Sequence, residues 1–99
     1  MSVFIIAQIS IHDRAGYAKY EEGFGAIFAR FEGTMLSVDE EVEVLEGDWS
    51  CTRTVVAQFP SSSEAKRWFE SADYQALAEH RKAASVGNIA LVKQLSTSA

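Results

Sequence analysis

The side chains best suited to chemistry include a pair of cations that follows an aromatic residue near the end of the chain. Arg81 comes seven residues after Tyr74, so both fall on one stripe of a helix, whereas His80 points about 100° away. A guanidinium at a cavity edge can hold a carboxylate through two hydrogen bonds, and a histidine can move a proton near neutral pH. The alternative is that both cations only complement the C-terminal end of the helix dipole.

Aromatic residues form a second group of candidates. Tyr17, Tyr20, Trp68 and Tyr74 have the helical spacing of a pocket lining, with hydroxyls available to a bound ring or carbonyl. The same spacing is what core packing requires, so both interpretations stay open. If the protein is an enzyme, His80 and Tyr20 are the candidates for handling a proton.

Arg53 lies close to Trp49 and Glu46, and this arrangement has two interpretations. Arg53 and Glu46 can form a structural ion pair, with the indole of Trp49 packed over the arginine stem. The same arginine can instead face a cavity and orient an acid. The ligand-binding candidates are therefore Arg53, Arg81, Trp68, Tyr74 and Tyr17.

Patterns typical of metal sites and activated nucleophiles are missing from the sequence. The acidic residues between 39 and 48 lack the glycine and glutamate positions of a calcium-binding loop, and His12 and His80 are isolated. Cys51 has no neighbouring histidine to activate it and cannot form an internal disulfide. We therefore expect neither a metal nor a cofactor.

Composition narrows the possible partners. The 99 residues suit one domain, residues 1–99, and 47% hydrophobic with 23% charged residues is typical of globular proteins. A net charge of −5 argues against nucleic acid and anionic membrane surfaces. The longest apolar run, Val3–Ala7, is too short to span a bilayer, and no leader peptide opens the chain. We expect a cytoplasmic protein.

Hydrophobic periodicity predicts the elements of the first half. Val3–Ile11 reads as a strand, and Asp13 as the N-cap of a helix that continues to Phe31, with Gly33 as its C-cap. Gly23 and Gly25 inside this helix indicate either a bend or a close approach by another backbone. Two strands should follow, at 34–38 and 52–59, joined by an acidic turn and a return through 42–45.

The second half has clear stop and start signals. Pro60 ends the third strand, and Ser61–Ser63 can cap a helix whose inward residues include Trp68. A break at 71–73 separates it from a second helical segment. Gly87-Asn88 then predicts a turn into a last strand at 89–95. The order β-α-β-β-α-β indicates a ferredoxin-like α+β fold, an antiparallel sheet with both helices on one face.

The strands also predict self-association. The first strand carries apolar residues in both phases of its alternation, such as Ile5 against Phe4 and Ile6, yet the helices can cover only one face of the sheet. A second copy packed sheet to sheet would cover the other face, so we expect a homodimer.

With these elements in place, the chain resembles the DUF1330 family, a domain of unknown function within the dimeric α+β barrel superfamily. The residues that carry the resemblance are Tyr17, Tyr20, Phe31, Gly33, Val44-Leu45-Glu46-Gly47-Asp48-Trp49, Arg53, Phe59-Pro60, Trp68, Ser71, Tyr74-Gln75, Arg81 and Gly87.

The resemblance implies a ferredoxin-like protomer, a dimer closed by two sheets, and a small cavity between each sheet and its helices. It implies no established reaction, although other branches of the superfamily include cofactor-free oxygenases. Similar sequences often have a basic residue and glycines where this chain has Val38-Asp39-Glu40. This departure argues against an anion contact from that turn. We predict a dimer that binds a small organic molecule, with or without cofactor-free catalysis; the alternative is an interaction module without catalytic activity.

Overall fold

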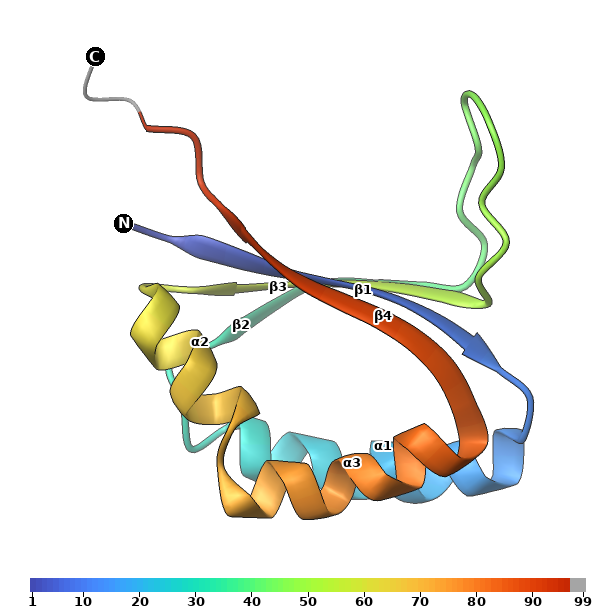
Figure 1. The fold of residues 1–99 in the computed structure, drawn as a ribbon, viewed down its shortest axis with the longest axis horizontal. Helices are drawn as coiled ribbons and strands as arrows, with labels where there is room; N and C mark the ends of the chain where they lie inside the picture. Colours follow the sequence, from blue (N-terminus) through green and yellow to red (C-terminus); the bar gives the residue numbers. More distant parts are fainter. Residues whose placement is uncertain (97–99) are drawn as a thin grey trace.

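A computed structural model describes residues 1–96 of the chain. Four strands form one antiparallel sheet in the order β2-β3-β1-β4, and three helices cover one of its faces (Figure 1). The strands are β1 Val3–Ile11, β2 Thr34–Asp39, β3 Arg53–Phe59 and β4 Ser85–Lys93. The helices are α1 Arg14–Phe28, α2 Ser62–Phe69 and α3 Ala72–Ala84. This topology confirms the predicted ferredoxin-like α+β fold.

The strand β1 lies inside the sheet, between β3 and β4. Its residues Val3, Ile5, Ala7 and Ile9 are buried beneath the helices, because successive side chains of a strand point to opposite faces. Ala7 is small, and so is Ala57, which pairs with Ile5 from β3. Two alanines in this layer leave room between the sheet and the helices.

Side-chain caps start all three helices at the predicted places. Asp13, Ser61 and Ser71 each accept a hydrogen bond from the backbone N–H three residues further along, over 3.1 to 3.2 Å. The cap at Ser71 also confirms the predicted break between the two helical segments, α2 and α3.

The predicted end of the first helix was wrong. α1 ends at Phe28, with Ala29 as its C-cap. Gly33 has a packing role instead, since an added Cβ would lie 2.5 Å from Cζ of Phe28 and 2.7 Å from Cζ of Phe59. At Gly23 the close neighbour is a side chain rather than a backbone, because a Cβ there would meet Cδ1 of Leu77 on α3 at 2.6 Å.

Two further predictions need correction. Residues 40–52, here called the arm, contain no strand where a return through 42–45 was expected. The last strand starts at Ser85, so Gly87 and Asn88 lie within β4 and form no turn. The reason is that α3 leads directly into β4, where Ser85 already pairs with Ile11 of β1.

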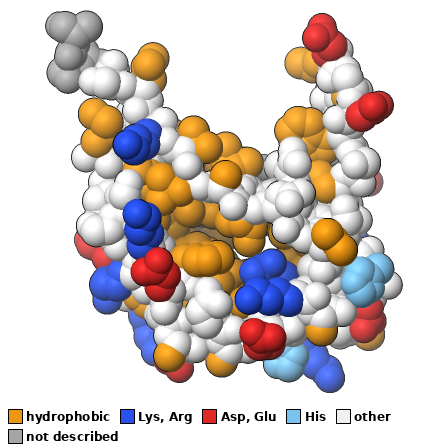
Figure 2. Space-filling view, viewed as in Figure 1, with side chains coloured by type: hydrophobic (Ala, Val, Ile, Leu, Met, Phe, Trp, Pro, Cys, Tyr) orange, Lys and Arg blue, Asp and Glu red, His pale blue; other side chains and the backbone are white. Residues whose placement is uncertain are grey.

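The arm projects from the sheet on the side opposite to the helices, and the segment after β4 rises on the same side (Figure 1). Both carry exposed apolar residues: Leu45 in the arm is 92% exposed and Leu95 after β4 is 84% exposed. Hydrophobic side chains also gather on the molecule between these two projections (Figure 2). We call the outer face of the sheet, which lies between these two projections, the apolar saddle.

Candidate functional site

A cavity of about 510 Å³ lies between the sheet and the helices. The small alanine side chains of the sheet leave space above the strands, and α1 packs mainly against α3. Small-molecule sites in proteins commonly have volumes of about 300–1,000 Å³. The lining residues are Ile5, Ala7, Ile9, Tyr17, Tyr20, Glu21, Phe24, Gly25, Phe28, Met35, Val38, Arg53, Val55, Ala57, Trp68, Tyr74, Arg81 and Ile89.

One part of the cavity wall consists of packed aromatic rings. The ring centroid of Trp68 lies 4.5 Å from that of Tyr74, 5.5 Å from Phe28 and 6.2 Å from Phe24. Phe24 and Phe28 stack at 5.1 Å on successive turns of α1. Such a wall suits a flat, unsaturated ligand, because rings gain both contact area and quadrupole complementarity from one another.

Two tyrosine hydroxyls meet at the cavity. The hydroxyls of Tyr20 on α1 and Tyr74 on α3 lie 2.8 Å apart and share a buried hydrogen bond. Burial, followed by the neighbouring Tyr74, raises the pKa of Tyr20 far above its ordinary value. Tyr20 therefore remains a neutral hydroxyl at physiological pH, which can donate a hydrogen bond but cannot serve as a phenolate base.

Two buried donors on the cavity wall have no hydrogen-bond partner in residues 1–96. They are Nε1 of Trp68 and Nε of Arg81, and the two residues are only 4% and 6% exposed. The guanidinium carbon of Arg81 lies 5.9 Å from the ring centroid of Tyr20. Buried polar groups in folded proteins are nearly always hydrogen-bonded, so these two unpaired donors mark a place in the wall where an acceptor is missing.

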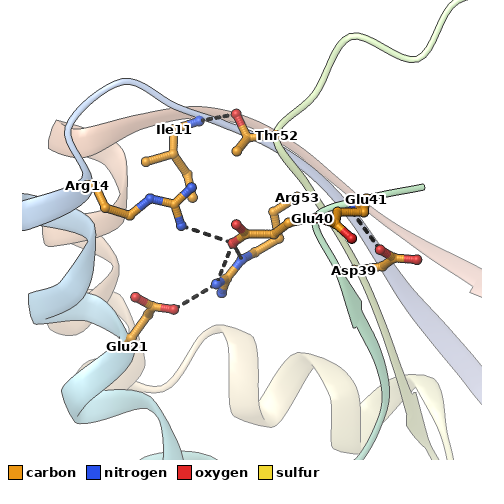
Figure 3. A network of polar contacts seen from close by, with 8 residues as sticks. All are labelled: Ile11, Arg14, Glu21, Asp39, Glu40, Glu41, Thr52 and Arg53. Carbon is orange, nitrogen blue, oxygen red and sulfur yellow. Dashed lines mark hydrogen bonds and ion pairs between the residues drawn. The ribbon is translucent and has the colours of Figure 1, made fainter. Parts of the chain in front are cut away.

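A network of ion pairs joins α1, the base of the arm and β3 beside the cavity (Figure 3). Arg53 donates to Glu21 over 2.7 Å and through Nε to Glu40 over 2.8 Å, while Arg14 donates to Glu40 over 3.0 Å. Hydrogen bonds from Arg14 and Arg53 lower the pKa of Glu40. Arg53 also lies over the ring of Tyr17, 5.1 Å from its centroid. These contacts fasten the base of the arm to the first helix.

The structure brings most of the predicted site residues together. The five ligand-binding candidates all line the cavity, and so does Tyr20. They come from four elements, which explains why no single stretch of sequence looked like a motif. These residues are Tyr17, Tyr20, Arg53, Trp68, Tyr74 and Arg81.

His80 is the candidate that the structure does not bring to the cavity. Its side chain is exposed on α3 and absent from the lining, while the next residue, Arg81, is buried. The helical rotation between neighbouring positions separates them.

The predicted partners of Arg53 were also wrong. Arg53 pairs with Glu21 and Glu40 and not with Glu46. The indole of Trp49 instead donates to the hydroxyl of Thr54 over 2.9 Å.

Among the lining residues that were not candidates at the sequence level, Glu21 and Gly25 are the ones that are not hydrophobic. A usable signal existed, because these positions follow Tyr17 at steps of four and so belong to the same helical stripe. An acid and a glycine did not fit an apolar pattern.

Metal ligands do not cluster in the part of the chain that the structure describes. Within residues 1–96, no three side chains of His, Cys, Asp or Glu are placed to hold an ion. None of the helices described there has the length and apolar character needed to cross a bilayer.

With the fold and the site described, the family can be assigned. The family described as "Domain of unknown function (DUF1330)" matches residues 2–95. The chain belongs to the DUF1330 family. No match was found among curated proteins.

Solved structures share the DUF1330 fold of this chain at low sequence identity. A protein of unknown function from Rhodopseudomonas palustris, RPA0582, superposes with a TM-score of 0.79 at 18% identity, covering 96% of this chain and 83% of its own. SnoaB from Streptomyces nogalater, described as a cofactor-independent oxygenase, gives 0.67 at 18% identity, with 98% and 96% covered. A dimeric protein of unknown function from Bacteroides fragilis gives 0.63 at 10% identity, with 94% and 96% covered. At such identities the likeness concerns the fold alone.

Proposed function

We propose that this DUF1330 protein binds a small, largely apolar organic molecule in the cavity between helices and sheet. The observation that carries the proposal is an open cavity whose wall combines aromatic rings with two unpartnered buried donors. A domain built only to pack its core would fill this space, since protein interiors are close-packed. Tyr17, Trp68 and Tyr74 supply ring surface, and Arg53 and Arg81 supply charge.

The same cavity suits chemistry without a cofactor. SnoaB, which shares the fold, is described as a cofactor-independent oxygenase. The cavity of this chain offers one hydroxyl proton from the Tyr20–Tyr74 pair and the cation of Arg81, and both can stabilise negative charge on a bound substrate. In this proposal Tyr20 is a donor and not a base, and His80 takes no part.

Blocking the cavity is the direct test, and Gly25 provides the means. Gly25 lines the cavity, and a Cβ built there has no heavy atom within 4 Å. A Gly25→Leu substitution therefore adds bulk at a lining position where the new Cβ meets no other atom, and it improves helix propensity. Ala26→Leu is the matched control, since Ala26 is exposed on the same helix and does not line the cavity.

The probe is N-phenyl-1-naphthylamine, a neutral dye that fluoresces in apolar surroundings. The chain has two tryptophans, so a Trp49→Phe background leaves Trp68 as the reporter inside the cavity. We expect dye binding to quench Trp68, Gly25→Leu to weaken binding at least about tenfold, and Ala26→Leu to change it by less than about twofold. Dye binding that is absent, or equal in both variants, would contradict the proposal.

A second candidate function, the interaction module, is favoured by the apolar saddle on the outer face of the sheet. We infer that a second copy of the chain covers this face, since a dimeric protein of the same fold is known from Bacteroides fragilis. Dimerisation is compatible with ligand binding. A dimer whose cavity rejects every probe would leave the interaction module as the function.

A further inference from the structure

We propose that the ligand of this cavity carries one anionic oxygen, from a carboxylate or a phenolate, and that Arg81 binds that oxygen. This inference rests on the proposed binding function and adds the ligand's charge and its orientation in the site.

The charges on the cavity wall do not balance. Its charged lining residues are Glu21, Arg53 and Arg81, and the first two pair with each other. Among residues 1–96, no carboxylate lies within ion-pair distance of Arg81, although this side chain is buried. A buried cation is costly unless an anion meets it, so the site has one positive charge that a monoanionic ligand can neutralise.

The guanidinium of Arg81 lies close to the backbone of β4. A Cβ at Gly87 would lie 3.5 Å from Nη1 of Arg81 and 2.8 Å from Cδ1 of Ile9. The guanidinium therefore lies at contact distance from the sheet at Gly87, and its Nε is buried without a partner. A planar guanidinium that has no carboxylate partner within residues 1–96 matches the two oxygens of a carboxylate or the single oxygen of a phenolate.

The tyrosine pair can supply a further donor to the ligand. Tyr20 and Tyr74 carry two hydroxyl protons but share only one hydrogen bond, so one proton is left to donate. Arg81 lies beside the ring of Tyr20, and Trp68 lies beside that of Tyr74. A ligand oriented by these groups places its anionic oxygen at Arg81 and its flat body against the aromatic wall.

The test compares two probes of the same shape, 2-naphthoate and neutral 2-naphthamide, on the Trp49→Phe background. We expect naphthoate to bind at least about tenfold more tightly, and Arg81→Gln to abolish this preference while naphthamide affinity changes by less than about twofold. Lys82→Gln is the control, because it removes the same charge from the exposed neighbouring position on α3. This variant should keep the preference.

The outcomes separate this inference from the function on which it rests. Equal binding of both probes, blocked by Gly25→Leu, would overturn the anionic ligand and leave the binding function intact. Failure of both probes to bind would overturn both. Absorbance of 4-nitrophenol distinguishes the two oxygen sources: conversion to phenolate upon binding to the wild type but not to Arg81→Gln assigns a phenolate, and naphthoate preference alone assigns a carboxylate.

Stability of the ligand-free protein gives an independent readout. If Arg81 serves to bind a ligand and not to stabilise the fold, Arg81→Met should raise the thermal midpoint of unfolding. The reason is that an apolar side chain of similar length then replaces an unpaired buried cation. Lys82→Met at the exposed position should leave the midpoint nearly unchanged. A lower midpoint, or a variant that fails to fold, would assign Arg81 a structural role and overturn the inference.

Discussion

The hydroxyls of Tyr20 and Tyr74 tie α1 to α3 through one buried hydrogen bond of 2.8 Å. Tyr20→Phe would leave the hydroxyl of Tyr74 buried without this partner, which typically costs about 1–3 kcal/mol. Tyr74→Phe should cost a similar amount. We expect either single substitution to lower the free energy of unfolding, measured with urea at neutral pH.

The double variant tests whether these two costs have one cause. Replacing both hydroxyls leaves no unpaired group, so Tyr20→Phe with Tyr74→Phe should cost clearly less than the sum of the single changes. Additive costs would mean that each hydroxyl acts separately, for example through water in the cavity. The donor role proposed for this pair would then need another explanation.

At the scale of elements, Glu40 fastens the arm to the rest of the chain, because its carboxylate holds both Arg14 of α1 and Arg53 of β3. Glu40→Gln keeps the shape and removes the charge, so we expect a lower free energy of unfolding at pH 7 and faster amide exchange at the base of the arm. Glu41→Gln is the control, since the Glu41 carboxylate has no ion pair within residues 1–96.

The pH dependence of this effect follows from the pKa of Glu40. That pKa is lowered in the folded chain from an ordinary value of 4.5, by Arg14 first and Arg53 second. The stabilisation is therefore complete above about pH 4.5 and is lost as the pH falls through the folded pKa. The gap between wild type and Glu40→Gln should close in acid. A gap that persists there would mean that the carboxylate acts through shape alone.

The elements differ in how far the sequence alone predicts them, and the reason is the range of the interactions that form them. The caps at Asp13 and Ser61 bond to backbone N–H groups three residues away, and both were predicted, as was the break at 71–73. The strand Val3–Ile11 was predicted from its own apolar run, although its pairing partners lie far away in β3 and β4. The partners of Arg53 lie 13 and 32 residues away, so local reasoning selected the nearer Glu46 instead.

The cavity could likewise be predicted only in part from the sequence. Its aromatic and cationic candidates could be predicted from residue type and helical spacing. The unpaired state of Arg81 could not be predicted, because it depends on which carboxylates the fold keeps away. The same holds for the open volume, which results from two alanines in the sheet and from the packing of α1 on α3.

At the scale of the whole molecule, the two faces of the sheet differ in what covers them. Helices cover one face, while the other carries Phe4 and Ile6 of β1 and Val92 of β4 between two projecting segments. Large apolar patches are uncommon on the surfaces of monomers. A twofold-related copy would place the same apolar patch opposite itself and bring the arm of each protomer beside its partner.

Ile6 is the best position at which to test this assembly. It pairs with Val56 of β3 and Ala90 of β4, in the middle of the outer face. Ile6→Lys would bury an unpaired cation in the interface, a cost of several kcal/mol that weakens association at least about 100-fold. Light scattering during size-exclusion chromatography should show a dimer for the wild type and a monomer for Ile6→Lys. Ala26→Lys, which adds the same charge to the exposed face of α1, should stay dimeric; a dimeric Ile6→Lys or a monomeric wild type would contradict the sheet-to-sheet assembly.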